Sequence, residues 1–151
     1  MASRPADPLD LSQQLCFAIY SAAHALNRAY KPLLEALNLT YPQYLVMLVL
    51  WETDDQTVGR IGDRLLLDSS TLTPLLKRLE AAGYVRRERD RADERQVRIR
   101  LTASGRSLKD RARGIPLAIA GAAGRTAAEL QRLKADILAL RDTLNAAGAA
   151  A

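Results

Sequence analysis

The sequence predicts a mainly α-helical protein that carries one small β-hairpin, and three observations support this fold class. Aromatic residues make up only 5% of the 151 residues while alanine and leucine are abundant, which favours helices over sheets. Apolar residues recur every three or four positions through much of the chain, as in amphipathic helices. Residues 97–101 instead alternate apolar and basic side chains, which is typical of a strand.

The composition indicates a globular protein with its own core. Hydrophobic residues make up 48% of the chain and charged residues 26%, and this length fits one domain. No uncharged apolar run approaches the ~20 residues that span a bilayer. Residues 1–11 lack the apolar centre of a secretory signal. We therefore expect a cytoplasmic protein with no membrane partner.

Two helices are predicted in the first third of the chain. Pro32 is expected to kink or split the first helix near its end. The second helix is expected over 41–51, with Thr40 as its cap and Pro42 in its first turn. The apolar face of the first helix is formed by Leu15, Ile19, Ala22, Leu26, Tyr30, Leu33 and Leu37.

Two shorter helices are predicted after the polar turn at 54–56. The first covers 58–65. The second is capped by the run from Asp68 to Ser70, continues to about Ala82, and is stopped by Gly83. Two helices joined by a short polar turn form a helix-turn-helix pattern.

A basic hairpin is predicted next, with strands at 84–89 and 96–101 and a charged tip at 90–95. A hairpin in this position is the wing of a winged helix. Its arginines are Arg86, Arg87, Arg89, Arg91, Arg95, Arg98 and Arg100.

The remainder of the chain is predicted to be helical. Thr102 and Ser104 are candidate caps of a fifth helix. Gly114 and Pro116 are expected to weaken or bend the next stretch, and 122–145 reads as an amphipathic helix. Its apolar stripe is formed by Leu130, Leu133, Ile137, Leu140 and Leu144.

The second helix of the helix-turn-helix carries side chains that suit DNA. Hydroxyls near a helix N-terminus contact phosphates or base edges, and Lys and Arg reach guanine edges or the backbone. The net charge of +5 fits an anionic partner. The leucines of this helix are expected to face the core, which leaves toward solvent Ser69, Ser70, Thr71, Thr73, Lys77 and Arg78.

The wing adds a second set of candidate DNA contacts. Arginine suits insertion into a narrow minor groove, and an ion pair with Asp93 would hold Arg95 in position. A charged hairpin alone is often only a solvated surface, but a basic hairpin directly after a helix-turn-helix is more specific. We predict binding of double-stranded DNA, with Arg86, Asp93, Arg95 and Arg98 contributed by the wing.

These segments resemble a known family. The runs 68–83 and 93–102 resemble the MarR family of winged-helix regulators, and the resemblance covers about 10–145. Three further strings are similar to OhrR, the branch of that family that senses organic hydroperoxides. They are Cys16-Phe17-Ala18-Ile19-Tyr20, Tyr30-Lys31-Pro32-Leu33 and the run from Leu67 to Pro74.

The resemblance implies a homodimer that represses transcription from a pseudo-palindromic operator. Residues 1–151 would then form a single MarR-type domain. Within it, 10–40 and 102–147 would form the helical dimerisation region, and 41–101 the DNA-binding region. The inducer would release the protein from its operator.

Cys16 is the only cysteine, so an intrachain disulfide and a cysteine zinc site are excluded. A lone cysteine is often an inert buried residue. Tyr30 and Tyr41, however, are polar-tipped aromatics that need a partner when buried. Along one straight helix, Cys16 and Tyr30 would lie about 21 Å apart. An antiparallel dimer would instead bring Cys16 of one subunit to the tyrosines of the other.

The resemblance implies that Cys16 is the reactive cysteine and that Tyr30 and Tyr41 hydrogen bond to it. Phe17, Ile19 and Tyr20 would favour a hydrophobic peroxide. The stretch 115–121 lacks the second cysteine of some relatives, which implies the one-cysteine type. Oxidation would produce a sulfenic acid, which is then capped by a small thiol as a mixed disulfide or overoxidised.

Three other functions compete with this interpretation. The first is a repressor that responds to a non-covalently bound ligand such as a phenol. The second is a single-cysteine peroxidase, and the third is a non-specific DNA-compacting protein. The sequence has no His/Cys cluster for a metal and no phosphate-cradling glycine motif. We therefore expect no cofactor and no enzyme activity.

Overall fold

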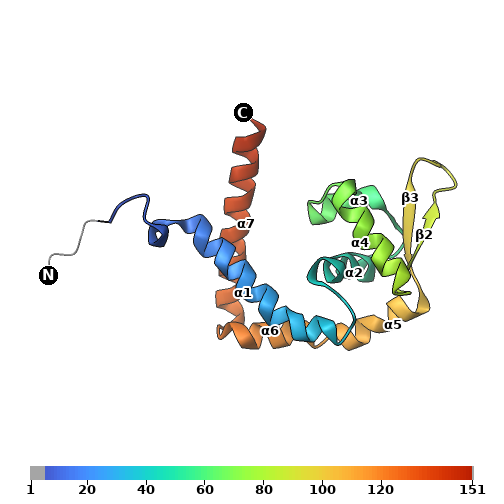
Figure 1. Cartoon of the computed structure of the whole chain (residues 1–151), viewed down its shortest axis with the longest axis horizontal. Coiled ribbons are helices and arrows are strands. Elements are labelled where there is room, and N and C mark those ends of the chain that lie inside the picture. The colour runs from blue at the N-terminus through green and yellow to red at the C-terminus, as the bar shows by residue number, and fades with distance from the viewer. Residues whose placement is uncertain (1–5, 151) are drawn as a thin grey trace. The chain divides into compact units, whose positions relative to one another are not determined.

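The computed structural model describes residues 6–150 and confirms a mainly helical fold with a small antiparallel sheet (Figure 1). The chain divides into two compact units, one ending at Arg113 and the other beginning at Gly114. In chain order the elements are η1 (Leu11–Gln13), α1 (Leu15–Glu35), α2 (Tyr41–Glu52), β1 (Gln56–Thr57), α3 (Val58–Leu65), α4 (Ser69–Ala81), β2 (Val85–Arg89), β3 (Val97–Leu101), α5 (Ala103–Ala112), α6 (Ile115–Ala123) and α7 (Ala127–Ala149).

Three predicted helix caps are confirmed, whereas Ser104, the other candidate for α5, lies inside that helix. Thr40 begins α2 in a reciprocal capping box with Gln43. Asp68 caps α4 and Thr102 caps α5, each accepting a backbone N–H of the first turn. These side chains satisfy amides that the helix itself leaves without partners.

The structure does not split α1 at Pro32, which lies in its last turn. Pro32 removes a single N–H donor, and only three residues of the helix follow it, so little helix lies beyond the disturbed turn and α1 continues to Glu35.

The sheet contains a strand that the sequence did not reveal. The two-residue β1 pairs antiparallel with β3, with Gln56 opposite Ile99, and the strand order is β1-β3-β2. The Gln56 amide is buried and donates to the carbonyl oxygens of Thr53 (2.5 Å) and Val49 (3.3 Å). A two-residue strand is too short to show a period of two, so only the fold reveals it.

The core of the first unit lies among α2, α3, α4 and the sheet. The four leucines of α4 that were predicted to face inward are buried, as Leu72, Leu75, Leu76 and Leu79. They meet α2, half of whose residues are buried. Burial of each such side chain contributes about 1.5–3 kcal/mol before the loss of conformational entropy. This packing fixes the orientation of α4.

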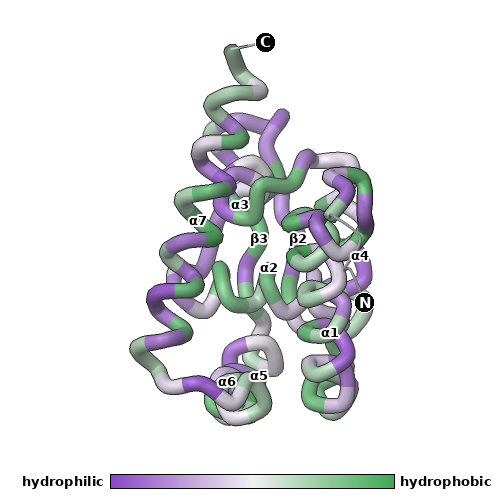
Figure 2. Tube along the Cα trace, turned by 90° about the vertical axis from the view of Figure 1, so that its left-hand side faces the viewer, coloured by the Kyte–Doolittle hydropathy of each residue, from purple (hydrophilic) through white to green (hydrophobic). Residues whose placement is uncertain are grey.

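The second unit consists of α6 and α7, so the amphipathic helix expected over 122–145 is present but begins later, at Ala127, after a break that follows Ala123. Gly124 adopts a left-handed conformation (φ +62°) that ends α6, and Thr126 and Glu129 form a capping box that begins α7. Both are sequence signals of a helix boundary. In Figure 2, α7 alternates between hydrophobic and hydrophilic segments. Its apolar side chains are exposed within one chain, including Leu133, Ile137, Leu138 and Leu144.

Among residues 6–150, no helix has both the length and the apolar character that a bilayer-spanning helix requires.

Candidate DNA-binding surface and thiol site

The first turn of α4 is organised by Asp68. Its Oδ1 accepts the Thr71 N–H (2.8 Å) and the Ser70 hydroxyl (2.7 Å). The hydrogen bond from Ser70 is the main cause that holds the pKa of Asp68 below its ordinary value, and the bond from Thr71 lowers this pKa further. The Thr73 hydroxyl donates to the Ser69 carbonyl oxygen (2.7 Å). The hydroxyls of this turn are therefore held in defined positions at the surface.

The six candidate residues of α4 do not share one face. Successive residues of an α-helix are rotated by about 100°, and the four core leucines fix which side faces inward. The candidates then form three pairs: Ser70 with Lys77 opposite the core, Ser69 with Thr73 on one flank, and Thr71 with Arg78 on the other.

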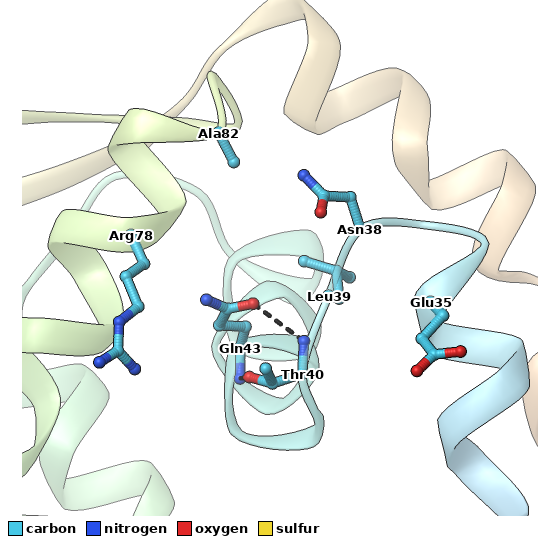
Figure 3. Close-up of a pocket in the computed structure, with 7 residues that line it drawn as sticks. All are labelled: Glu35, Asn38, Leu39, Thr40, Gln43, Arg78 and Ala82. Atoms are coloured by element: carbon cyan, nitrogen blue, oxygen red, sulfur yellow. Dashed lines mark hydrogen bonds between the residues drawn. The ribbon is translucent and has the colours of Figure 1, made fainter.

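Two cavities show what each flank faces. Ser69 and Thr73 line a cavity of about 630 Å³ together with Arg95 of the hairpin. Arg78 lines a different cavity of about 510 Å³, beside Gln43, where α1 ends and α2 begins (Figure 3). The structure therefore brings Ser69, Thr73 and Arg95 together and places Arg78 apart from them.

The wing, formed by β2, β3 and the connecting residues 90–96, exposes Arg95 at its tip. The Arg95 side chain is 93% exposed, and its Nε lies 3.3 Å from Asp93 Oδ1, which also accepts the Arg95 N–H. The ion pair predicted between these two residues is present. Arg86 is exposed near the base of the wing, opposite Arg100. Contact of these side chains with DNA stays a prediction.

Arg98, also a candidate DNA contact, hydrogen bonds within the protein through all three of its guanidinium nitrogens, and its side chain is 32% exposed. Its Nε donates to Asp55 Oδ1 (2.7 Å), its Nη2 to the Asp55 carbonyl oxygen (2.8 Å), and its Nη1 to Asp90 Oδ2 (2.9 Å). The other oxygen of Asp90 accepts the N–H groups of Ala92 and Asp93 in the wing tip. We call this arrangement the Arg98 clamp. It attaches the wing tip to the turn before β1.

The turn at Asp54 and Asp55 is a part of the site that sequence analysis missed. Asp55 adopts a left-handed conformation (φ 59°), which Asp tolerates better than most residues. It binds Arg100 as well as Arg98 (3.2 Å from Arg100 Nε). Asp54 Oδ1 accepts the Leu101 N–H (2.8 Å). A pair of aspartates about 45 residues before the wing arginines gives no local signal of this contact.

We expect acid to loosen the wing. The hydrogen bonds from Arg98 hold the pKa of both Asp55 and Asp90 below the ordinary value. A carboxyl group whose pKa is lowered by folding stabilises the folded state at any pH above its ordinary pKa of about 4. This stabilisation is lost as the pH falls from there through the pKa of the folded state. Amide protection factors in the wing should therefore stay constant down to about pH 4 and drop below it. An Asp90→Asn protein should show the weaker protection at neutral pH as well. Unchanged protection between about pH 5 and 3 would contradict this prediction.

The candidate thiol site is open on α1. Cys16 is exposed, and its neighbours Phe17, Ile19 and Tyr20 are 43%, 38% and 63% exposed. Tyr20 contacts His24, with ring centroids 4.5 Å apart. Large apolar side chains gathered at an exposed surface are typical of an interaction site, so this face of α1 is a candidate interaction surface.

The two tyrosines predicted to bind the thiol do lie together, at the far end of α1. The ring centroids of Tyr30 and Tyr41 are 4.9 Å apart. Within one chain, the rise of α1 places Tyr30 about 21 Å from Cys16. The structure thus assembles the two phenols and keeps them away from the thiol of the same chain.

A third phenol, Tyr44, joins this pair and was missed by sequence analysis. Its ring lies 5.9 Å from Tyr30 and 6.3 Å from Tyr41, and 6.4 Å from Trp51. Its position three residues after Tyr41 in α2 was the available signal. Burial is the main cause that raises the pKa of Tyr30 and Tyr44. These phenols stay protonated at neutral pH and can donate hydrogen bonds.

Residues 6–150 contain no group of three or more His, Cys, Asp or Glu side chains arranged to hold an ion.

The fold and these surfaces define a winged-helix protein, with α3 and α4 as the helix-turn-helix and a basic wing beside them. The family model of the transcriptional regulators SarA/Rot matches residues 28–112. This stretch contains the helix-turn-helix, the wing and the phenols.

Comparison with known proteins gives closely similar regulators. The transcriptional regulator TtmR of Methylorubrum extorquens is 56% identical over 140 residues, covering 93% of this chain and 72% of that protein. The organic hydroperoxide resistance transcriptional regulator of Bacillus subtilis is 45% identical over 139 residues, covering 92% of this chain and 95% of that protein. The chain belongs to the MarR family of winged-helix transcriptional regulators, in the OhrR branch, and has one cysteine.

Among solved structures, AbfR of Staphylococcus epidermidis is similar in both of its DNA-bound forms. The reduced form superposes with a TM-score of 0.78 at 39% identity, covering 89% of this chain and 92% of that one. The overoxidized form gives a TM-score of 0.74 at 37% identity, covering 89% and 94%.

Proposed function

We propose that this protein is a homodimeric repressor that binds a pseudo-palindromic operator and leaves it when an organic hydroperoxide oxidises Cys16. The observation that carries the proposal is the preformed phenol pair of Tyr30 and Tyr41, about 21 Å along α1 from the thiol of the same chain. A second subunit is needed to complete such a site.

The DNA-binding side of the proposal combines the recognition helix, α4, with the wing. Ser70 and Lys77 point away from the core toward the major groove, while Ser69, Thr73 and Arg95 line one concave surface beside them. Arg95 is exposed enough to enter a minor groove. The reduced form of the similar AbfR is bound to DNA, which supports this function.

The dimer would be built on the exposed apolar faces. Leu15, Ile19 and Leu26 of α1 are exposed, as are Leu133 and Ile137 of α7. A two-fold pair with the α1 helices antiparallel would place Cys16 of each subunit at the phenols of its partner. This arrangement follows the division predicted from the sequence, in which 10–40 and 102–147 form the dimerisation region.

The chemistry proposed at Cys16 takes two steps. The thiolate, stabilised by hydrogen bonds from the phenols, attacks the outer oxygen of the hydroperoxide, which gives a sulfenic acid and releases an alcohol. A small cellular thiol then attacks the sulfenic acid sulfur, which forms a mixed disulfide and water. Phe17, Ile19 and Tyr20 supply the apolar surface that favours an organic peroxide.

The mixed disulfide, rather than overoxidation, is assigned as the state that leaves DNA. The overoxidized form of AbfR is bound to DNA, so added oxygen atoms alone need not release such a protein. A capping thiol adds far more volume to a packed interface, and close-packed interfaces respond by shifting as units. The two recognition helices would then lose the separation of about 34 Å that successive half-sites require.

Two measurements test the two halves of this proposal. Fluorescence anisotropy should show tighter binding to a duplex from the region upstream of the protein's own gene than to a shuffled duplex of the same composition. Intact mass spectrometry after cumene hydroperoxide and a small thiol should show one added thiol per chain. Equal affinity for both duplexes would favour non-specific DNA compaction. Addition of the thiol to a Cys16→Ser protein would exclude Cys16 as the target.

Loss of one phenol should slow the oxidation of Cys16. A hydrogen bond to a charged group is worth about 1.5–3 kcal/mol, so Tyr41→Phe should reduce the second-order rate with cumene hydroperoxide by about tenfold or more. Stopped-flow measurement with a thiol probe would give the rate. The matched control is Tyr84→Phe, which lies outside the phenol cluster and should leave this rate unchanged. A Tyr41→Phe rate equal to wild type would contradict the proposed role.

A second candidate function rests on the cavity of about 510 Å³ at the end of α1. Figure 3 shows Arg78 of α4 on one side and Glu35 of α1 on the other, with Gln43 between them. A small phenolic carboxylate held there would bridge the recognition helix and α1 without redox chemistry. Release of a Cys16→Ser protein from DNA by salicylate, but not by peroxide, would favour this function.

A further inference from the structure

Tyr84 joins three helices of the first unit. Its N–H donates to the Leu79 carbonyl oxygen in the last turn of α4 (3.0 Å), and its own carbonyl oxygen accepts the N–H of Thr102, the cap of α5 (3.0 Å). Its hydroxyl donates to the Leu37 carbonyl oxygen, just beyond α1 (2.8 Å). One side chain thus links the end of the recognition helix to the end of α1.

Both ends of this link are anchored. Leu37 is 4% exposed and lies between the buried Leu34 and Leu39. On the other side, the Thr102 hydroxyl donates to the carbonyl oxygen of Gly83 (2.6 Å), next to Tyr84 in the chain. A displacement of the Leu37 carbonyl group is therefore passed to Tyr84 rather than absorbed by loose side chains.

The other end of α1 carries the thiol. From Cys16 to Glu35 the helix rises about 28 Å without interruption. Because α1 is one continuous helix over this length, a sideways displacement of its Cys16 end would shift Leu37, which lies two residues beyond its last residue, Glu35. Side-by-side shifts of packed helices are a common way for proteins to switch.

We propose that the Tyr84 hydroxyl couples the oxidation state of Cys16 to the orientation of the recognition helix. Tyr84 acts as a positioning residue and touches neither DNA nor peroxide. The proposal rests on the function proposed above, because it takes the movement of α1 from the capping of Cys16.

A second contact at the end of α1 provides a matched control. Arg111 of α5 donates from Nη2 to the Ala36 carbonyl oxygen (2.6 Å), one residue before Leu37, and forms no hydrogen bond with any residue of α4 as the structure describes it. Arg111→Gln removes a hydrogen bond at the same place while leaving the link to the recognition helix intact. Tyr84→Phe removes only the hydroxyl and keeps the ring, so the fold should be retained.

The test omits peroxide and caps Cys16 directly by exchange with glutathione disulfide, which leaves a mixed disulfide on Cys16 and releases reduced glutathione. The affinity for the upstream duplex is measured for the reduced and the capped protein. We expect capping to weaken binding about tenfold or more in wild type and in Arg111→Gln, within the usual range of coupling between sites. In Tyr84→Phe it should weaken binding by less than about threefold, with unchanged affinity in the reduced state.

The outcomes separate this inference from the proposed function. Equal weakening in wild type and Tyr84→Phe would overturn the inference while leaving the proposed function intact. Retained binding of capped Arg111→Gln would also overturn it, because any loosening of the α1 end would then suffice. If capping left wild type fully bound, the proposed release step would fail and the coupling with it.

Discussion

Replacing Arg98 with glutamine is expected to weaken operator binding by about ten- to a hundredfold, although Arg98 itself makes no contact with DNA in our account. The guanidinium binds Asp55 and Asp90 through all three nitrogens. Without it, the wing tip loses its attachment, and Arg95 is no longer held where the minor groove passes. A good arginine contact is worth about 1–3 kcal/mol, and each 1.4 kcal/mol is a tenfold change in affinity.

Arg100→Gln is the matched control for this prediction. Arg100 is a neighbouring wing arginine that binds Asp55 through a single nitrogen and is half exposed. Its removal takes the same charge from the protein but leaves the clamp in place, so affinity should fall by less than about fivefold. Equal losses from the two substitutions would show that only the charge matters. Anisotropy at one fixed salt concentration measures both, because phosphate contacts make affinity salt-dependent.

Replacing Gly105 with alanine is expected to destabilise the protein by about 3 kcal/mol, the upper end of the range for overpacking. A Cβ at this position would collide with the carbonyl oxygen of Tyr84, which is backbone and cannot rotate away. The Gly105 carbonyl oxygen also accepts the Trp51 indole N–H (2.9 Å). Backbone movement to relieve the collision would disturb the contact between α5 and α2.

Gly59→Ala is the control for this second prediction. A Cβ at Gly59 meets nothing within 4 Å, and its position in α3 favours alanine by about 0.5–1 kcal/mol. Urea unfolding of both variants, at the same protein concentration because dimerisation contributes to stability, should move the midpoints in opposite directions. A Gly105→Ala urea midpoint within error of the wild-type value would mean that α5 can shift away from the Tyr84 carbonyl oxygen without loss of stability.

Much of the fold was predictable because its signals are local. Thr40, Asp68 and Thr102 are caps that hydrogen bond within one turn, and the leucines of α4 define its buried face by spacing alone. The boundary between α6 and α7 was equally local, at Gly124 and the capping box after it, and the leucine stripe obscured it. The strand β1 differs because the strand it pairs with, β3, lies about 40 residues away.

The same distinction between local signals and contacts made by the tertiary fold applies to the site. Cys16, Tyr30 and Arg95 were predictable as chemically suitable residues. The structure places Tyr30 next to Tyr41, with their ring centroids 4.9 Å apart. The partners of Arg98 and Tyr84 were not predictable, because Asp55 and Leu37 reach them only through the tertiary fold. Sequence patterns show which groups are able to react or bind, whereas the fold determines which of them are already engaged.

The central claim is that peroxide releases the repressor through Cys16. Its most direct test is a cumene hydroperoxide titration, in the presence of a small thiol, of wild type and Cys16→Ser bound to the upstream duplex. We predict release of wild type at about one peroxide per subunit, recovery of binding after addition of dithiothreitol, and no release of Cys16→Ser. Equal release of both proteins would contradict the claim and place the sensor elsewhere in the chain.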